Sequence, residues 1–265
     1  MMRYLIFSFL VTLTGVCSAQ NQGIIYYGHI ESPGKGGPAG LDFNAYLVFD
    51  KAASYYVTAK DSLENQAELE RQQTKEVNGS SQMYVGKHTL PQGKQVYYNR
   101  HKDSLWWNKK YKEPVYGREK RDKINWKLEP ETKTFGGLIC HKATGVFRGK
   151  TYTAWYTKKI PLPYGPWKLQ GLPGIILEAY DEKKEMYLYF KSIEYPTPQN
   201  LTIGPIVKPK EDSNYNWISL NEYKDLLEKL VERNKTKAIL IAKQMGGDVT
   251  VNSGGIETLS VEVFN

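Results

Sequence analysis

The side chains that most often do chemistry are sparse in this 265-residue chain and stand apart from one another. Its histidines occur singly, with no second His, Cys or paired carboxylate at metal-ligand spacing: His29, His88, His101 and His141. Cys140 and His141 are adjacent, but neighbouring residues of a strand point to opposite faces. We therefore expect no metal site, no cofactor and no thiol nucleophile, and Cys140 is expected to be a small buried side chain beside a surface histidine.

Enzyme motifs are equally sparse. The sequence contains no GxSxG elbow, no HExxH helix and no Gly-rich phosphate loop. Carboxylates remain as candidates, and Glu178 or Asp181 would serve a hydrolase whose site has no recognisable motif. We keep that enzyme as the alternative to a non-catalytic role.

The most distinctive chemistry of the chain is aromatic and lies in residues 151–178, TYTAWYTKKIPLPYGPWKLQGLPGIILE. Three prolines fix φ between residues 160 and 167, which predicts a stiff, non-helical span. Four aromatic side chains around it are candidates to line a ligand groove: Trp155, Tyr156, Tyr164 and Trp167. The alternative is that these rings fill a second layer of the core.

The end of this stretch holds the motif Gly171, Leu172, Pro173 and Gly174, and its residues Leu172-Pro173-Gly174-Ile175 are a candidate turn. Proline followed by glycine is typical of a type II turn, in which Gly174 would have a positive φ. Two strand-like runs follow, at residues 175–180 and 186–190, and the charged residues between them predict a hairpin.

These residues also carry a resemblance to a known family. The segments WYT, IPLPYGPWKLQ and GLPGIILE resemble the signature of the GLPGLI family of secreted proteins from Bacteroidetes-type bacteria, and WKLEPETKTFGGLICHKATG resembles the segment before it. The resemblance implies a shared fold and export from the cytoplasm. The family has no established activity, so the resemblance carries over no catalytic residue.

The N-terminus predicts a signal peptide over residues 1–19. Arg3 precedes an apolar run, and Cys17-Ser18-Ala19 supplies the small residues before a cleavage site. Lipid attachment at Cys17 is less favoured because Val16 precedes it. Cleavage after Ala19 would remove one cation and no acid, so the formal charge of +8 falls to +7. We expect a single domain over residues 20–265, located in the periplasm or secreted, with Cys140 unpaired.

The mature chain reads as a mainly β protein with one long helix. The strand-like runs have the spacing of an antiparallel meander: 23–30, 43–50, 54–58, 82–86, 94–101, 104–107, 115–118, 124–128, 133–141 and 151–157. Residues 61–76 are polar and predict an exposed helix or an insertion. Ser219 and Glu222 form a capping box that starts a long amphipathic helix ending near Gly246-Gly247, and residues 249–263 suggest a closing hairpin.

This pattern predicts a curved antiparallel sheet or open half-barrel with the C-terminal helix packed on it. The basic, aromatic residues 97–121 resemble a nucleic-acid surface, but export argues against that partner. Solvent-exposed strand faces explain the same pattern, and a peripheral contact with anionic lipid is the other possibility.

The sequence therefore predicts a cell-envelope binding or accessory protein. Its groove would hold an apolar ligand, a peptide or an outer-membrane partner, and a structural subunit of an outer-membrane complex is a further alternative. The sequence leaves the oligomeric state open.

Overall fold

A computed structural model describes residues 22–72, 74–77, 80–83, 86–244 and 254–264. The predicted signal peptide, the Gly246-Gly247 helix stop and the first arm of the predicted C-terminal hairpin lie outside these ranges.

β-Strands are the predominant regular structure of the described chain. The strands are β1 (Gly23–Glu31), β2 (Asp42–Phe49), β3 (Ala53–Thr58), β4 (Thr74–Val77), β5 (Ser80–Met83), β6 (Lys94–Asn99), β7 (Ser104–Lys110), β8 (Pro114–Lys120), β9 (Lys127–Phe135), β10 (Leu138–Phe147), β11 (Lys150–Thr157), β12 (Ile175–Asp181), β13 (Met186–Glu194) and β14 (Trp217–Ile218). The helices are α1 (Gln66–Gln72) and α2 (Leu220–Gln244), with short 3-10 turns η1 (Asp61–Leu63), η2 (Lys210–Asp212) and η3 (Ile256–Thr258).

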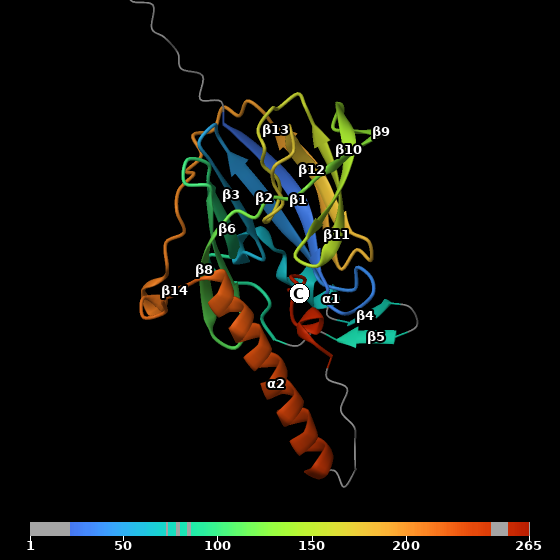
Figure 1. Cartoon of the computed structure of the whole chain (residues 1–265), viewed down its shortest axis with the longest axis vertical. Coiled ribbons are helices and arrows are strands. Elements are labelled where there is room, and N and C mark those ends of the chain that lie inside the picture. Colours follow the sequence, from blue (N-terminus) through green and yellow to red (C-terminus); the bar gives the residue numbers. More distant parts are fainter. Residues whose placement is uncertain (1–21, 73, 78–79, 84–85, 245–253, 265) are drawn as a thin grey trace, which may run out of the picture.

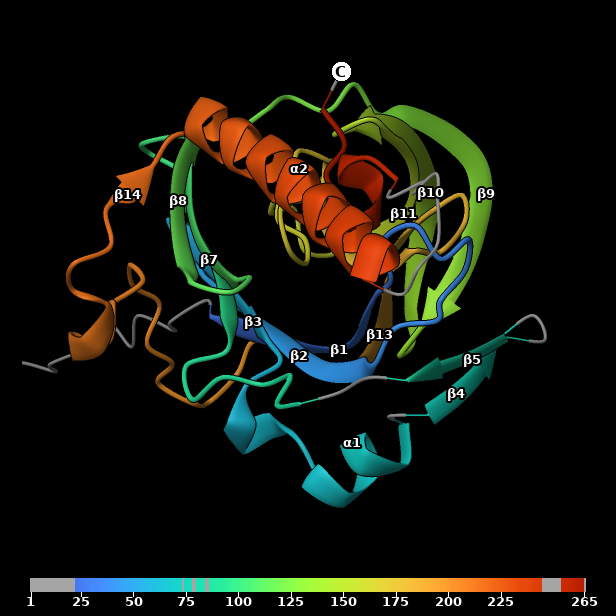
Figure 2. The same ribbon diagram turned by 90° about the horizontal axis from the view of Figure 1, so that it is seen from below.

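Twelve strands form one open sheet in the order β14-β8-β7-β6-β3-β2-β1-β13-β12-β11-β10-β9, and β4 and β5 form a separate hairpin. Two antiparallel meanders meet where β1 pairs with β13, and β14 adds a short parallel edge beside β8. Seen from below, the sheet curls around its own interior (Figure 2). The predicted mainly β class and curved antiparallel sheet are therefore confirmed.

Helix α2 begins at the predicted capping box. The Ser219 N–H donates to Glu222 Oε2 at 2.7 Å, and the Glu222 N–H donates back to Ser219 Oγ at 3.3 Å. The helix crosses the open end of the sheet and then extends beyond it (Figures 1 and 2). Its first turns are held there by Tyr223, whose ring packs edge-on against Trp107 with centroids 4.6 Å apart.

The concave side of the sheet is filled by the proline-rich segment, residues 158–174. Ile160, Leu162 and Tyr164 belong to the same core cluster as strand residues such as Ile25 and Leu47. The segment is tied to β12 by backbone bonds from the Ile175 N–H to the Ile160 carbonyl and from the Ile176 N–H to the Tyr164 carbonyl. The stiff span that the prolines predict is thus an internal plug of the half-barrel.

The exposed helix predicted within residues 61–76 is present as α1, but the region also packs on the sheet, because Leu69 is buried with Leu41 and Phe43, and Glu64 accepts a bond from the Asn44 N–H. One local prediction is wrong. The second arm of the predicted C-terminal hairpin is not a strand. Residues 256–258 form η3, and a backbone bond from the Val263 N–H to the Arg148 carbonyl then joins the described C-terminal segment to the β10–β11 turn.

Among the described helices, none combines the length and apolar character that crossing a membrane requires.

Candidate functional site

The four aromatic residues proposed to line a groove are divided between two core clusters. Tyr164 is fully buried against Phe49 and Tyr98, whereas Trp167 packs against Phe147 and Tyr152. Tyr156 is also buried, and Trp155 is half-buried. The structure places these rings in the packing of the sheet and its plug, and it does not gather them around one opening.

The Gly171 to Gly174 motif differs from the predicted turn. Gly171 has a φ of +97°, but Gly174 is not among the residues with positive φ, so the type II turn is wrong. Glycine is required at Gly174 for a different reason, because a Cβ there would lie 2.1 Å from the Thr157 carbonyl oxygen. Leu172 is buried, Pro173 is exposed, and the motif lets the plug pass close to the end of β11.

A layer of charged side chains lies inside the half-barrel. Lys109 Nζ is 2.5 Å from Glu31 Oε1, and Lys94 Nζ is 3.6 Å from Glu31 Oε2. Burial acts to raise the pKa of Glu31, but the charges of Lys109 and Lys94 outweigh it and hold that pKa far below its usual value. His29 lies beside them, with Nδ1 2.8 Å from the Tyr56 hydroxyl.

These groups surround a cavity of about 30 Å³, which also touches Trp107, Lys168 and Glu262. A space of that size holds about one or two water molecules. The interior is therefore polar in places but too full to hold a lipid or another large apolar ligand.

Lys168 fixes the plug to two other parts of the chain. Its Nζ lies 3.0 Å from Glu119 Oε1 on β8 and 2.8 Å from Glu262 Oε1 near the C-terminus. The ammonium group also stands 4.1 Å from the centre of the Trp107 ring. Arg148 completes the group, with Nη2 2.9 Å from Glu119 Oε2. Because these charges are almost wholly buried, the loss of one partner would leave another uncompensated.

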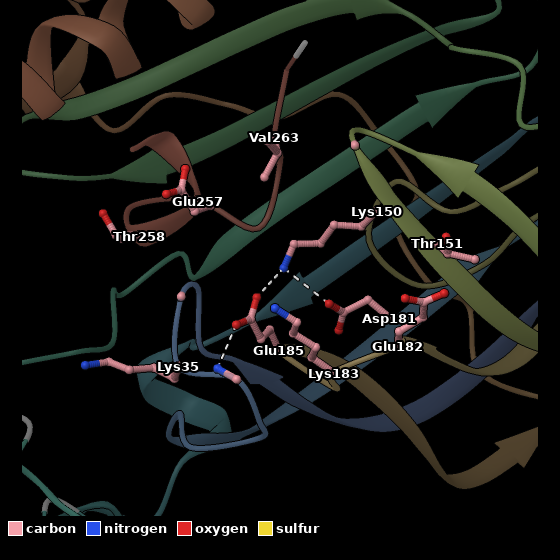
Figure 3. A pocket seen from close by; sticks show the side chains of 13 residues that line it. Lys35, Lys150, Thr151, Asp181, Glu182, Lys183, Glu185, Glu257, Thr258 and Val263 are labelled. Carbon is pink, nitrogen blue, oxygen red and sulfur yellow. Dashed lines mark hydrogen bonds and ion pairs between the residues drawn. The ribbon is translucent and has the colours of Figure 1, made fainter. Parts of the chain in front are cut away.

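A larger opening lies at the end of the half-barrel where α2 begins. We call it the rim pocket. It has a volume of about 610 Å³ and is lined by Gly34, Lys35, Gly36, Gly149, Lys150, Thr151, Asp181, Glu182, Lys183, Glu185, Glu257, Thr258 and Val263. Its walls are the glycine-rich loop after β1, the start of β11, the β12–β13 turn and the C-terminal segment (Figure 3). Val263 is the one apolar side chain in this lining, and apart from the glycines the other lining residues end in charged or hydroxyl groups.

A three-residue ion cluster forms one wall of the rim pocket. Lys150 Nζ lies 2.6 Å from Glu185 Oε2 and 3.2 Å from Asp181 Oδ2, as the dashed lines of Figure 3 show. The second oxygen of each carboxylate accepts a backbone bond, at 2.7 Å from the Gly36 N–H to Glu185 and at 2.8 Å from the Met186 N–H to Asp181. The cluster therefore joins the glycine-rich loop, β11 and the β12–β13 hairpin.

The ionisation of this cluster follows from its contacts. Burial acts to raise the pKa of Glu185, but the hydrogen bond from Lys150, the Gly36 N–H and the charge of Lys150 outweigh it. The pKa of Glu185 is therefore below its usual value, and the carboxylate is ionised at neutral pH. An ionised carboxylate can bind cations and hydrogen-bond donors, but it cannot donate a proton to a leaving group.

The other candidate residues lie away from the rim pocket. Cys140 is fully buried, and burial first, then the charge of Glu178, raises the pKa of its thiol to about 12, so it remains a neutral thiol. Glu178 is buried and pairs with Lys133 at 3.1 Å. Among the described residues, no three His, Cys, Asp or Glu side chains are grouped to hold a metal ion.

Asp181 is the one candidate from the sequence that lines the pocket, whereas Lys150, Glu185 and the internal lysines were missed. Two sequence features gave weak indications of these residues. SPGKGGPAG was recognisable as a loop, and Lys168 stands alone between Trp167 and Leu169 in an apolar stretch. Neither signal names the partner, which lies far away in sequence.

Comparison with known proteins finds a match for part of the chain. Residues 146–178 match a family described as "Protein of unknown function (Porph_ging)". This region runs from the end of β10 through β11 and the plug into β12. The match covers much less than half of the chain and does not establish the GLPGLI name, which stays a prediction. Curated proteins gave no match.

Two solved structures of PNGF-II, one in a P21 and one in a C2 crystal form, resemble the fold distantly. The sequence identity is 14% in both cases, with TM-scores of 0.46 and 0.45. Each alignment covers 77% of this chain and 32% of the other, so this chain spans about a third of the PNGF-II length.

Proposed function

We propose that this chain is an exported cell-envelope protein that binds a polar ligand, most simply a peptide segment, in the rim pocket. One observation carries the proposal. The concave face, where an apolar ligand would have to sit, is occupied by residues 158–174, whereas the rim pocket is open and lined by charged and backbone polar groups. A binding role with no reaction chemistry remains the better interpretation.

The lining suits a peptide because it offers both kinds of hydrogen-bonding partner. Lys150 and Lys183 supply ammonium groups, and in Figure 3 that of Lys183 points toward the same space as Lys150. The exposed carboxylates of Glu182 and Glu257 supply acceptors, and the buried Asp181 and Glu185 hold Lys150 in place. A peptide backbone has N–H donors and C=O acceptors in equal number, so it can pair with both sets, while an aliphatic ligand would leave them unpaired.

The hydrolase alternative has one observation in its favour, which is that Asp181 and Glu185 share the single cation Lys150 in an open pocket. Paired carboxylates perform acid-base chemistry when their surroundings push the two pKa values apart and leave one of them protonated. The lowered pKa of Glu185 is the opposite shift for a general acid. An outer-membrane partner that presents the ligand remains compatible with the binding role.

Native mass spectrometry of the protein after incubation with an envelope extract tests this proposal. The wild-type chain should carry the added mass of a bound polar ligand. Lys183→Glu should lose that added mass, because a fourth carboxylate would stand beside Asp181, Glu182 and Glu185. Lys51→Glu, which makes the same charge change in the exposed β2–β3 turn, is the control and should retain the mass. Retention of the same mass by Lys183→Glu would exclude the rim pocket as its site.

A further inference from the structure

The two halves of α2 have different surroundings. The buried residues Tyr223, Leu227 and Leu230 all lie in its first half, and no residue from Val231 to Gln244 is buried. Figure 1 shows this second half extending away from the sheet. At 1.5 Å per residue it reaches roughly 20 Å beyond the last buried side chain. Packing on the half-barrel therefore explains why the helix starts where it does, and it does not explain its length.

The exposed half has an unusual composition. Residues 233–244, RNKTKAILIAKQ, contain four cations and no Asp or Glu. The cations flank an apolar run at residues 238–242, AILIA, in which Leu240 is 56% exposed and Ile241 is 47% exposed. Exposing isoleucine and leucine to water is unfavourable, and another surface that covered them would recover that free energy.

The arrangement around the helix axis indicates what covers it. Successive residues are 100° apart, so Ile239, Leu240 and Ile241 point in three different directions. The four cations, Arg233, Lys235, Lys237 and Lys243, are likewise distributed around the axis. A groove on a protein partner takes one stripe at i, i+3, i+4 and i+7 spacing, and this tip has no single stripe. These side chains are better matched by a surface that surrounds the tip with apolar groups and places anions beside its four cations.

We infer that the tip of α2, residues 233–244, docks into the surface of a membrane that contains anionic lipid. Ile239, Leu240 and Ile241 enter the boundary between headgroups and acyl chains, while the four cations pair with lipid phosphates. Five apolar residues are far fewer than a membrane span needs, so the contact is peripheral. Docking through the tip holds the half-barrel at the membrane surface by its α2 end, which is also the end that carries the rim pocket.

Co-sedimentation with lipid vesicles tests this inference on the full chain. Wild-type protein should pellet with vesicles of phosphatidylglycerol and phosphatidylcholine in equal parts, should pellet far less with phosphatidylcholine alone, and should be released by added salt. Replacing Lys235 and Lys237 together by Gln should lower the partition coefficient roughly 30-fold, because each cation near an anionic surface contributes about 1 kcal/mol. Leu240→Ser combined with Ile241→Ser should lower it by more than about tenfold.

Matched controls separate the tip from general charge and hydrophobicity. Lys51→Gln with Lys102→Gln removes two exposed cations from turns at the other end of the sheet, and Val207→Ser removes an apolar side chain that is 80% exposed. These controls should pellet like the wild type. All the substituted side chains are solvent-exposed, so thermal unfolding midpoints should stay unchanged.

Three outcomes of the vesicle assay would overturn the inference. They are absence of wild-type pelleting, equal pelleting with and without phosphatidylglycerol, and an equal loss in the controls. A self-associated species in sedimentation velocity that disappears with Leu240→Ser and Ile241→Ser would also overturn it, by assigning the tip to contact between copies of the chain.

Discussion

The internal histidine shows how one buried side chain couples this fold to pH. His29 is 3% exposed, and burial lowers its pKa to about 3; Glu31 acts to raise the pKa, and Lys94 and Lys109 act to lower it. The unfolded chain, with a histidine pKa near 6.5, takes up the proton first. The neutral form therefore stabilises the fold above pH 6.5, and this contribution is lost progressively as the pH falls from 6.5 toward 3.

We predict that His29→Gln flattens the pH dependence of the free energy of unfolding between pH 6.5 and 5. In the wild type this group contributes a slope of up to about 1.4 kcal/mol per pH unit in that window. Glu31 does not contribute to this slope. Its pKa in the folded chain is lowered, so its protonation changes the free energy of unfolding only below the ordinary glutamate pKa of 4.5. Urea titrations of both proteins at several pH values measure the slopes, and equal slopes would show that His29 is protonated in the folded state.

At the scale of elements, the junction between the plug and β12 depends on glycines that allow close backbone contact. A Cβ at Gly174 would lie 2.1 Å from the Thr157 carbonyl oxygen, and one at Gly165 would lie 2.5 Å from the Leu169 carbonyl oxygen. Even Gly165→Ala is therefore disruptive, because a backbone atom cannot move aside as a side chain can.

We predict that Gly174→Val and Gly165→Ala each lower the free energy of unfolding by at least about 2 kcal/mol. Gly204→Ala is the control, since a Cβ there meets nothing within 4 Å and its φ is not positive. It should change stability by less than about 0.5 kcal/mol. Urea titration separates the three variants, and a Gly174→Val protein as stable as the control would refute the role of close packing.

The α1 region supplies a second prediction at this scale. Leu69 is 5% exposed in a small cluster with Leu41, Phe43 and Ala59. Leu69→Ala should cost roughly 2 to 3 kcal/mol, because it removes buried methyl groups and leaves a cavity. Glu70→Ala changes an exposed side chain of the same helix and should be nearly neutral. If thermal unfolding of both variants matches the wild type, residues 61–76 are the dispensable insertion that their composition suggests.

The elements themselves were largely predictable, and their boundaries less so. Alternation of apolar residues predicts β2 and β11 because each of these strands presents one side to a core cluster, and the Ser219–Glu222 box predicts the start of α2 because capping is local. The Ile and Tyr content of β1 predicts that strand, which is buried on both faces. The predicted runs 124–128 and 133–141 differ from the observed bounds of β9 and β10, Lys127–Phe135 and Leu138–Phe147. Much of β9 is an exposed edge strand, so burial imposes no period on its residues.

At the scale of the whole molecule, the candidate site depends on contacts that no local pattern encodes. Gly36 and Glu185 are 149 residues apart in the chain, and Lys150 and Glu185 are 35 apart. The aromatic residues were recognisable as a group, but whether they line a groove or fill it depends on where the plug lies. The sequence presents the plug as a stiff segment, and only the fold places it on the concave face.

The central claim is that residues 158–174 fill the half-barrel permanently and leave binding to its rim. Hydrogen exchange measures this directly at four amides of the plug and its junction, those of Leu169, Gly171, Ile175 and Ile176, each bonded to a carbonyl of the plug. We predict that they exchange as slowly as the paired amides of β1, because the plug can open only when the fold opens. Exchange several orders of magnitude faster at these amides than in β1 would show that the plug leaves the concave face, and would contradict the account.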